Sequence, residues 1–134
     1  MFALDDNCCA NFQVAVDEYL IRHRSVLDVL TKYQEATARV NRAFAKAVTE
    51  CGCIEIKAGR QQAPSQIQYS DLKHFVSSHV SGEPCEQCKE VLTNELGRSL
   101  FYMAALCNLS GLKIHDVLRQ ECKNITTLGA FHLS

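Results

Sequence analysis

Two pairs of closely spaced cysteines carry the most specific chemical signal in this sequence. One residue separates Cys51 from Cys53, two residues separate Cys85 from Cys88, and 31 residues lie between the pairs. A tetrahedral Zn²⁺ takes four thiolate ligands, and two short-spaced pairs can supply them while closing the loop between them. Gly52 favours tight chelation because glycine adopts backbone conformations that other residues avoid. The spacing predicts a structural zinc site at Cys51, Cys53, Cys85 and Cys88.

The same cysteines allow two other interpretations. They could carry out dithiol–disulfide chemistry, or they could be separate buried thiols. His74 and His79 lie between the two pairs, and either could replace one cysteine as a metal ligand. Cys107 and Cys122 fall on apolar helical faces, where we expect small buried side chains. No local arrangement of residues indicates a catalytic thiol.

Composition narrows the class of protein. The chain has 134 residues, 47% of them apolar, which predicts one domain over residues 1–134. Its 14 basic and 15 acidic residues give a net charge of −1, which argues against binding to a nucleic-acid polymer. Residues 1–6 do not resemble a signal peptide, and no apolar run is long enough to cross a membrane. We therefore expect a cytoplasmic protein with reduced thiols and no membrane partner.

The elements that must position the cysteines are predicted to be helices. Apolar residues recur at intervals of three and four over 6–22, 25–52, 84–111 and 113–122. Ser25 is suited to cap the second helix, and Gly52 and Gly111 are suited to end the second and third. Residues 51–84 are predicted to form an irregular insertion with a short helix over 70–76, in which Leu72, Phe75 and Val76 face inward. The segment 54–56 is too short to form a sheet alone.

The predicted fold class is therefore all-α, a helical bundle with a short irregular insertion. Three of its helices carry wide apolar faces, but the chain has no tryptophan and only ten phenylalanine and tyrosine side chains. A monomer would cover these faces incompletely. We expect association into a homodimer or homotetramer to complete the core.

Two of these segments resemble the motif helices of MazG-like proteins. Residues 94–106, Asn-Glu-Leu-Gly-Arg-Ser-Leu-Phe-Tyr-Met-Ala-Ala-Leu, followed by Gly-Leu-Lys-Ile at 111–114, are similar to the second motif helix. Residues 32–38, Lys-Tyr-Gln-Glu-Ala-Thr-Ala, are similar to the first. The resemblance covers most of residues 25–122 outside the insertion. It implies an all-α nucleoside triphosphate pyrophosphohydrolase fold, in which carboxylates of the two helices hold Mg²⁺ ions that bridge the substrate phosphates.

The carboxylates of the family's motifs are only partly present. Where the resemblance implies three glutamates in the first helix, this chain has Gln34, Glu35 and Ala38. Where it implies a glutamate and an aspartate in the second, the chain has Glu95 and Arg98. Glu35 and Glu95 are thus the candidate catalytic residues, and the fixed positive charge of Arg98 should weaken Mg²⁺ binding.

The cations beside these carboxylates suggest a different ligand. Arg98 could pair with Glu35 and Glu95 or could bind a phosphate directly, and Lys32, Arg39 and Arg42 could join such a site. The alternative without a binding function is an ordinary charged helix face, with Glu35 paired to Arg39 one turn away.

Three functions follow from these observations. The first is a MazG-like protein with a structural zinc site that binds a nucleotide or another protein and has weak or no hydrolase activity. The second is an active Mg²⁺-dependent nucleoside triphosphate pyrophosphohydrolase that uses Glu35, Glu95 and further carboxylates such as Glu90 or Asp116. The third is a thiol-based redox sensor.

Overall fold

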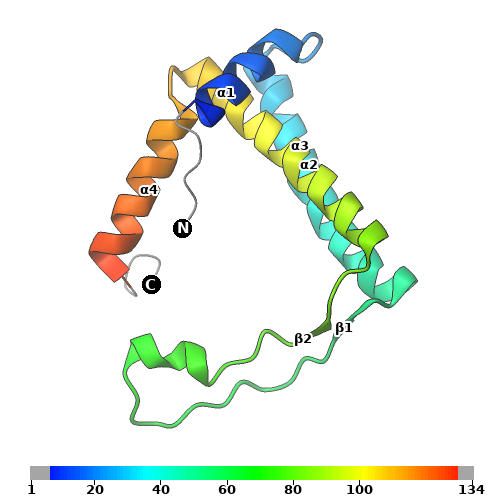
Figure 1. Cartoon of the computed structure of the whole chain (residues 1–134), viewed down its shortest axis with the longest axis vertical. Helices are drawn as coiled ribbons and strands as arrows, with labels where there is room; N and C mark the ends of the chain where they lie inside the picture. The colour runs from blue at the N-terminus through cyan, green and yellow to red at the C-terminus, as the bar shows by residue number, and fades with distance from the viewer. Residues whose placement is uncertain (1–6, 130–134) are drawn as a thin grey trace.

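The computed structural model describes residues 7–129, which form four α-helices and a small insertion (Figure 1). The long helices α2 and α3 lie side by side and run in opposite directions, and α1 crosses them at one end. α4 leaves from that end and runs apart from the α2–α3 pair. The predicted all-α class is confirmed at this level. The bounds are α1 Cys8–Tyr19, α2 Val26–Lys46, α3 Glu86–Ser110 and α4 Ile114–Leu128.

Local sequence signals fix the ends of the long helices. The hydroxyl of Ser25 accepts a hydrogen bond from the Leu27 backbone N–H at 3.2 Å, which satisfies one of the free donors at the start of α2. Gly111 ends α3 with a φ of 71°, a left-handed conformation that glycine adopts without steric cost. Both predicted caps are confirmed.

The insertion leaves the far end of the α2–α3 pair as a narrow arm (Figure 1). Its base is an antiparallel ladder of two short strands, in which Ile54 faces Gly82 and Ile56 faces Val80. Farther out, the Gln61 side chain bridges to the backbone of Ser77 with two hydrogen bonds of 2.7 and 2.9 Å. The insertion comprises β1 Ile54–Ile56, a 3₁₀ helix Tyr69–His74, and β2 Val80–Gly82.

The main core lies where the four helices meet. Val16 of α1, Val29 of α2 and Ala104 of α3 are essentially inaccessible to solvent there, together with the first residue of α4, Ile114. Toward the arm, the buried side chains of the pair are the small residues Ala36 and Ala47, followed by Ile54 of β1. Apolar burial is thus concentrated at one end, and the arm's end needs another source of stability.

Several sequence predictions for individual elements are wrong. The last helix does not end at Cys122 but continues to Leu128, because no glycine or proline interrupts it before Gly129. Cys122 is exposed rather than buried, since little of the chain packs against α4. Phe75 and Val76 do not face a core, because the 3₁₀ helix projects away from the helices.

Other boundaries differ less. The first helix ends at Tyr19 rather than Arg22, and Asp6, where it was predicted to begin, lies outside the described residues. The third long helix begins at Glu86 rather than at Pro84. None of the helices within residues 7–129 is both long enough and apolar enough to span a bilayer.

Candidate metal centre

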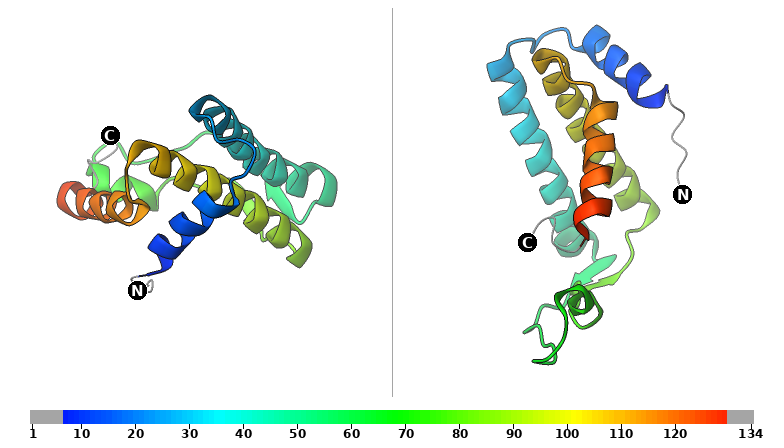
Figure 2. Two further views of the ribbon diagram at one scale, coloured as in Figure 1. Left: turned by 90° about the horizontal axis from the view of Figure 1, so that it is seen from above. Right: turned by 90° about the vertical axis from the view of Figure 1, so that its left-hand side faces the viewer.

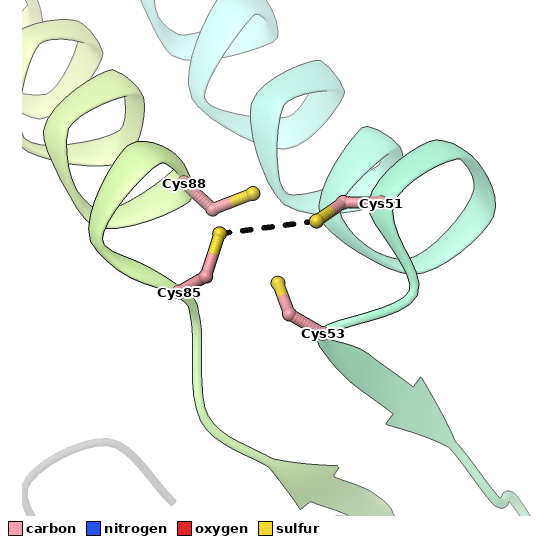
Figure 3. Close-up of side chains that lie close together, drawn as sticks. All are labelled: Cys51, Cys53, Cys85 and Cys88. Carbon is pink, nitrogen blue, oxygen red and sulfur yellow. Dashed lines mark hydrogen bonds between the residues drawn. The ribbon is translucent and has the colours of Figure 1, made fainter.

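Four cysteine sulfurs converge at the base of the arm (Figure 3). The sulfurs of Cys51, Cys53, Cys85 and Cys88 all lie within 4.8 Å of one another, and those of Cys51 and Cys85 are 3.8 Å apart. None of the four forms a disulfide. The two pairs predicted from spacing are therefore brought together, and the interpretation as separate buried thiols does not describe them.

The backbone at the end of α2 directs Cys51 and Cys53 toward the other two sulfurs. After Lys46 the helix widens into a π-helical turn, Ala47–Cys51, which the Gly52 backbone N–H closes by donating to the Ala47 carbonyl at 2.8 Å. Gly52 has a φ of 79°, which turns the chain between Cys51 and Cys53. Most other residues adopt that conformation only with strain, so Gly52 allows both sulfurs to reach one centre, as the sequence predicted.

The second strand supports the cysteines through a close backbone contact. Gly82 has a φ of 86°, and a Cβ atom built there would lie 2.7 Å from the carbonyl oxygen of Cys53. Real Cβ atoms do not approach that closely, so any side chain at this position would displace Cys53 or the strand. The sequence alone does not reveal this contact, because it depends on the pairing of two strands that are distant in the chain.

The second pair lies at the N-terminus of α3. Cys85 is the N-cap residue and Cys88 lies in the first turn. The pKa of Cys85 is lowered to about 7, first by the Cys88 backbone amide and then by the Cys88 thiol. A helix N-terminus is known to favour the thiolate form of a cysteine, and the lowered pKa of Cys85 agrees with its place there.

The close approach of the sulfurs raises the pKa of two other cysteines of this group, Cys88 and Cys51. The pKa of Cys88 is raised to about 12, first by the thiols of Cys53 and Cys85. At Cys51 the backbone amide of Cys53 acts to lower the pKa, but the thiols of Cys53 and Cys85 outweigh it and the pKa is raised. Thiolates this close repel one another unless a cation compensates their charge. The arrangement can therefore hold a metal ion.

The histidines of the insertion do not belong to this group. His74 lies at the end of the 3₁₀ helix, and His79 precedes β2 with its backbone N–H donating to the Ser77 hydroxyl at 3.0 Å. Among residues 7–129, the four cysteines form the one group of three or more His, Cys, Asp or Glu side chains close enough to hold a metal.

The remaining predicted site residues lie between α2 and α3, away from the sulfurs. Lys32, Glu35, Arg39 and Arg98 line a cleft of about 200 Å³, to which Tyr102 also contributes an aromatic wall that the sequence did not single out. Arg42 does not line it. Both oxygens of Glu35 are paired, Oε2 with Lys32 at 3.2 Å and Oε1 with Arg39 at 3.5 Å. Lys32 first, and Arg39 second, lower the pKa of Glu35.

Glu95 is largely buried beside this cleft, not fully solvated. Its Oε1 lies 3.8 Å from Nη1 of Arg39. Its Oε2 is buried and has no hydrogen-bond partner among the described residues. Among the described residues, Arg98 forms no ion pair with Glu35 or Glu95. Arg39, rather than Arg98, thus links the two carboxylates.

No known protein family, curated protein or solved structure matches this chain. The similarity of residues 25–122 to MazG-like proteins stays a prediction that rests on the quoted segments.

Proposed function

We propose that this chain is a MazG-like binding protein in which Cys51, Cys53, Cys85 and Cys88 hold one structural Zn²⁺. One observation carries the zinc proposal, the convergence of four thiols within 4.8 Å. A Zn–S bond of about 2.3 Å in a tetrahedron places neighbouring sulfurs about 3.8 Å apart. The Cys51–Cys85 separation of 3.8 Å matches that edge.

The donor set determines which metal the site prefers and what the metal does. Four thiolates select a soft or borderline cation and disfavour Mg²⁺ or Ca²⁺, which prefer oxygen. Four protein sulfurs also leave no position open for water or substrate, as is typical of structural rather than catalytic zinc. The ion would tie the end of α2 to the start of α3, at the end of the pair where fully buried large apolar side chains are scarce.

The cleft between α2 and α3 supports binding without two-metal hydrolysis. Each hard cation needs several oxygen ligands, whereas both oxygens of Glu35 already face cations and Glu95 offers one unpaired oxygen. The described residues therefore do not fit a pair of Mg²⁺ ions. Lys32, Arg39 and Arg98 suit an anion instead, and Tyr102 offers a ring face beside them. We infer that the ligand is a nucleotide phosphate.

Metal analysis of the purified protein tests the zinc site. We expect one Zn²⁺ per chain, lost in the variant carrying Cys53→Ser and Cys88→Ser. The matched control is Cys122→Ser, because Cys122 is exposed on α4 outside the cluster. Zinc-free protein that cannot be loaded with zinc, or a double variant that still holds one ion, would overturn the zinc proposal.

Calorimetric titration with a nucleoside triphosphate, without divalent metal, tests the cleft. We expect binding that Lys32→Ala and Arg98→Ala each weaken by about tenfold, the loss of one charge-assisted contact. Lys123→Ala on α4 serves as the control. If the nucleoside triphosphate does not bind, a protein is the remaining candidate for the ligand. Mg²⁺- or Mn²⁺-dependent release of pyrophosphate that disappears in Glu35→Gln or Glu95→Gln would instead establish the pyrophosphohydrolase.

A further inference from the structure

One sulfur–sulfur contact in the cysteine cluster joins the two pairs across the insertion. Cys51 ends the π-helical turn and Cys85 is the N-cap residue of α3. Their sulfurs are 3.8 Å apart and point toward each other (Figure 3). A disulfide has a sulfur–sulfur distance of about 2.0 Å, so the two atoms must move closer by about 1.8 Å, which rotation about the Cα–Cβ bonds can supply. The two thiols are therefore placed to form a disulfide.

The cluster lies at the surface, where a small oxidant can reach it. It is at the end of the α2–α3 pair opposite α1, as the right view of Figure 2 shows. Cys51 is exposed and the other three cysteines are half-buried, whereas Cys107 is buried in the main core. Cys51 and Cys88 also line a surface cleft of about 480 Å³ between the end of α2 and the start of α3. Cys51 is thus the member of the cluster that is most open to solvent.

We propose that Cys51 and Cys85 are a reversible oxidation site for hydroperoxides, at which a disulfide across the insertion replaces the metal. Cysteines that bind zinc are thiolates, so exposure decides which sulfur reacts first. The Cys51 thiolate attacks the O–O bond of the peroxide, which breaks to give the sulfenic acid of Cys51 and an alkoxide or hydroxide. The Cys85 thiolate then attacks the Cys51 sulfur and displaces hydroxide, forming the disulfide.

The two steps balance in electrons and protons. Each of the two sulfurs loses one electron, and the pair of electrons reduces one O–O bond. Two protons from solvent convert the displaced anions into water, or into water and an alcohol. An external dithiol reverses the reaction by thiol–disulfide exchange.

Oxidation of this pair would also release zinc. Cys53 and Cys88 would be left as two of the four sulfur ligands that a structural zinc site requires. This part of the inference rests on the proposed zinc site, whereas the disulfide needs only the two thiols.

The disulfide would keep the ends of the arm together without the metal. Cys51 and Cys85 are 34 residues apart in the chain, so a bond between them closes the insertion just as the metal does. A disulfide within either pair would leave α2 and α3 unlinked at this end. The oxidised protein should therefore unfold at a higher temperature than the reduced, metal-free protein.

Peptide mapping of the full chain without reducing agent tests the proposal. Zinc-loaded protein is treated with one equivalent of hydrogen peroxide, its remaining thiols are blocked with N-ethylmaleimide, and it is digested with trypsin. Trypsin places Cys51 and Cys53 in the peptide 47–57, and Cys85 and Cys88 in the peptide 74–89. We expect one disulfide to join these two peptides and dithiothreitol to separate them. A metal-sensitive dye should show zinc released at the rate at which the link forms.

Two matched double variants identify the sulfurs that react. Cys53→Ser with Cys88→Ser retains Cys51 and Cys85, and should form the link within about threefold of the rate of metal-free wild type. Cys51→Ser with Cys85→Ser retains the other two thiols, and should form it at least tenfold more slowly. Each variant keeps two of the four metal ligands, so loss of zinc affects both alike. Equal rates in the two variants would overturn the assignment.

Other results of the peptide map would overturn the proposal as well. These are disulfides confined to one peptide, sulfinic acids without a link, and oxidation of Cys122, which is exposed on α4, before that of the cluster. Protein that holds no zinc but still links the two peptides would contradict the zinc site alone. Protein that holds zinc but does not link them would contradict the oxidation site alone.

Discussion

Replacing Gly82 by alanine should weaken metal binding through a residue that touches no metal. The new Cβ would lie 2.7 Å from the Cys53 carbonyl oxygen, and the φ of 86° is strained for alanine. Such strain costs about 1–3 kcal/mol. A two-stranded ladder as short as β1–β2 is marginal alone, so without metal it can open and relieve the strain. Nearly all of the cost then falls on the metal-bound state.

That free energy corresponds to a roughly 5- to 160-fold rise in the Kd for zinc. Competition with a chromophoric chelator measures the Kd, and the matched control is Gly59→Ala in the same insertion. At Gly59 a Cβ would contact nothing within 4 Å and φ is not positive, so its Kd should stay within twofold of wild type. A Gly82→Ala protein that binds zinc as tightly as Gly59→Ala would refute the reasoning.

Three further results are expected. Gly52→Val should raise the zinc Kd about tenfold, and Gly52→Asn much less, because asparagine tolerates the left-handed conformation at φ 79°; the same chelator competition measures both. Gln13→Ala should lower the free energy of unfolding in urea by about 1–3 kcal/mol through loss of its hydrogen bonds to Asn108, Leu112 and Ile114, whereas the exposed Gln62→Ala should not. In metal-free protein at pH 7.5, mass spectrometry should show iodoacetamide modifying Cys85 before buried Cys107, whose pKa burial raises. The Cys85 thiolate is the form present above its pKa of about 7. Lowering the pH from 8 to 6 should therefore slow the reaction of Cys85 with iodoacetamide and weaken zinc binding. A reaction rate of Cys85 that does not change with pH would contradict the assigned pKa.

The position of the four-cysteine cluster determines what a bound zinc ion would contribute to the stability of this fold. A cross-link across a loop of about 31 residues stabilises the folded state by roughly 4 kcal/mol in the chain-entropy description. The end of the α2–α3 pair near the arm buries mainly Ala36, Ala47 and Ile54, so a contribution of this size would be large there. Zinc would thus replace the apolar core that the opposite end of the pair possesses.

Local signals in the sequence determined the helices and the cysteine pairs. Ser25 caps α2 through its own hydroxyl, and Gly111 ends α3 because glycine lacks a Cβ atom, so both positions could be predicted from residue type. The spacing of Cys51, Cys53, Cys85 and Cys88 was also sufficient to predict their convergence, because two short-range pairs beside one loop need only the loop ends to meet.

Contacts between distant segments were decided by the tertiary structure alone. The pairing of Ile54–Ile56 with Val80–Gly82 places Gly82 against Cys53, and the packing of α2 against α3 brings Glu95 close to Arg39. The exposure of Cys122 follows likewise from the direction of α4, which Gln13 sets from the other end of the chain. Helical periodicity shows that a face is apolar, but what covers that face depends on where the other elements lie.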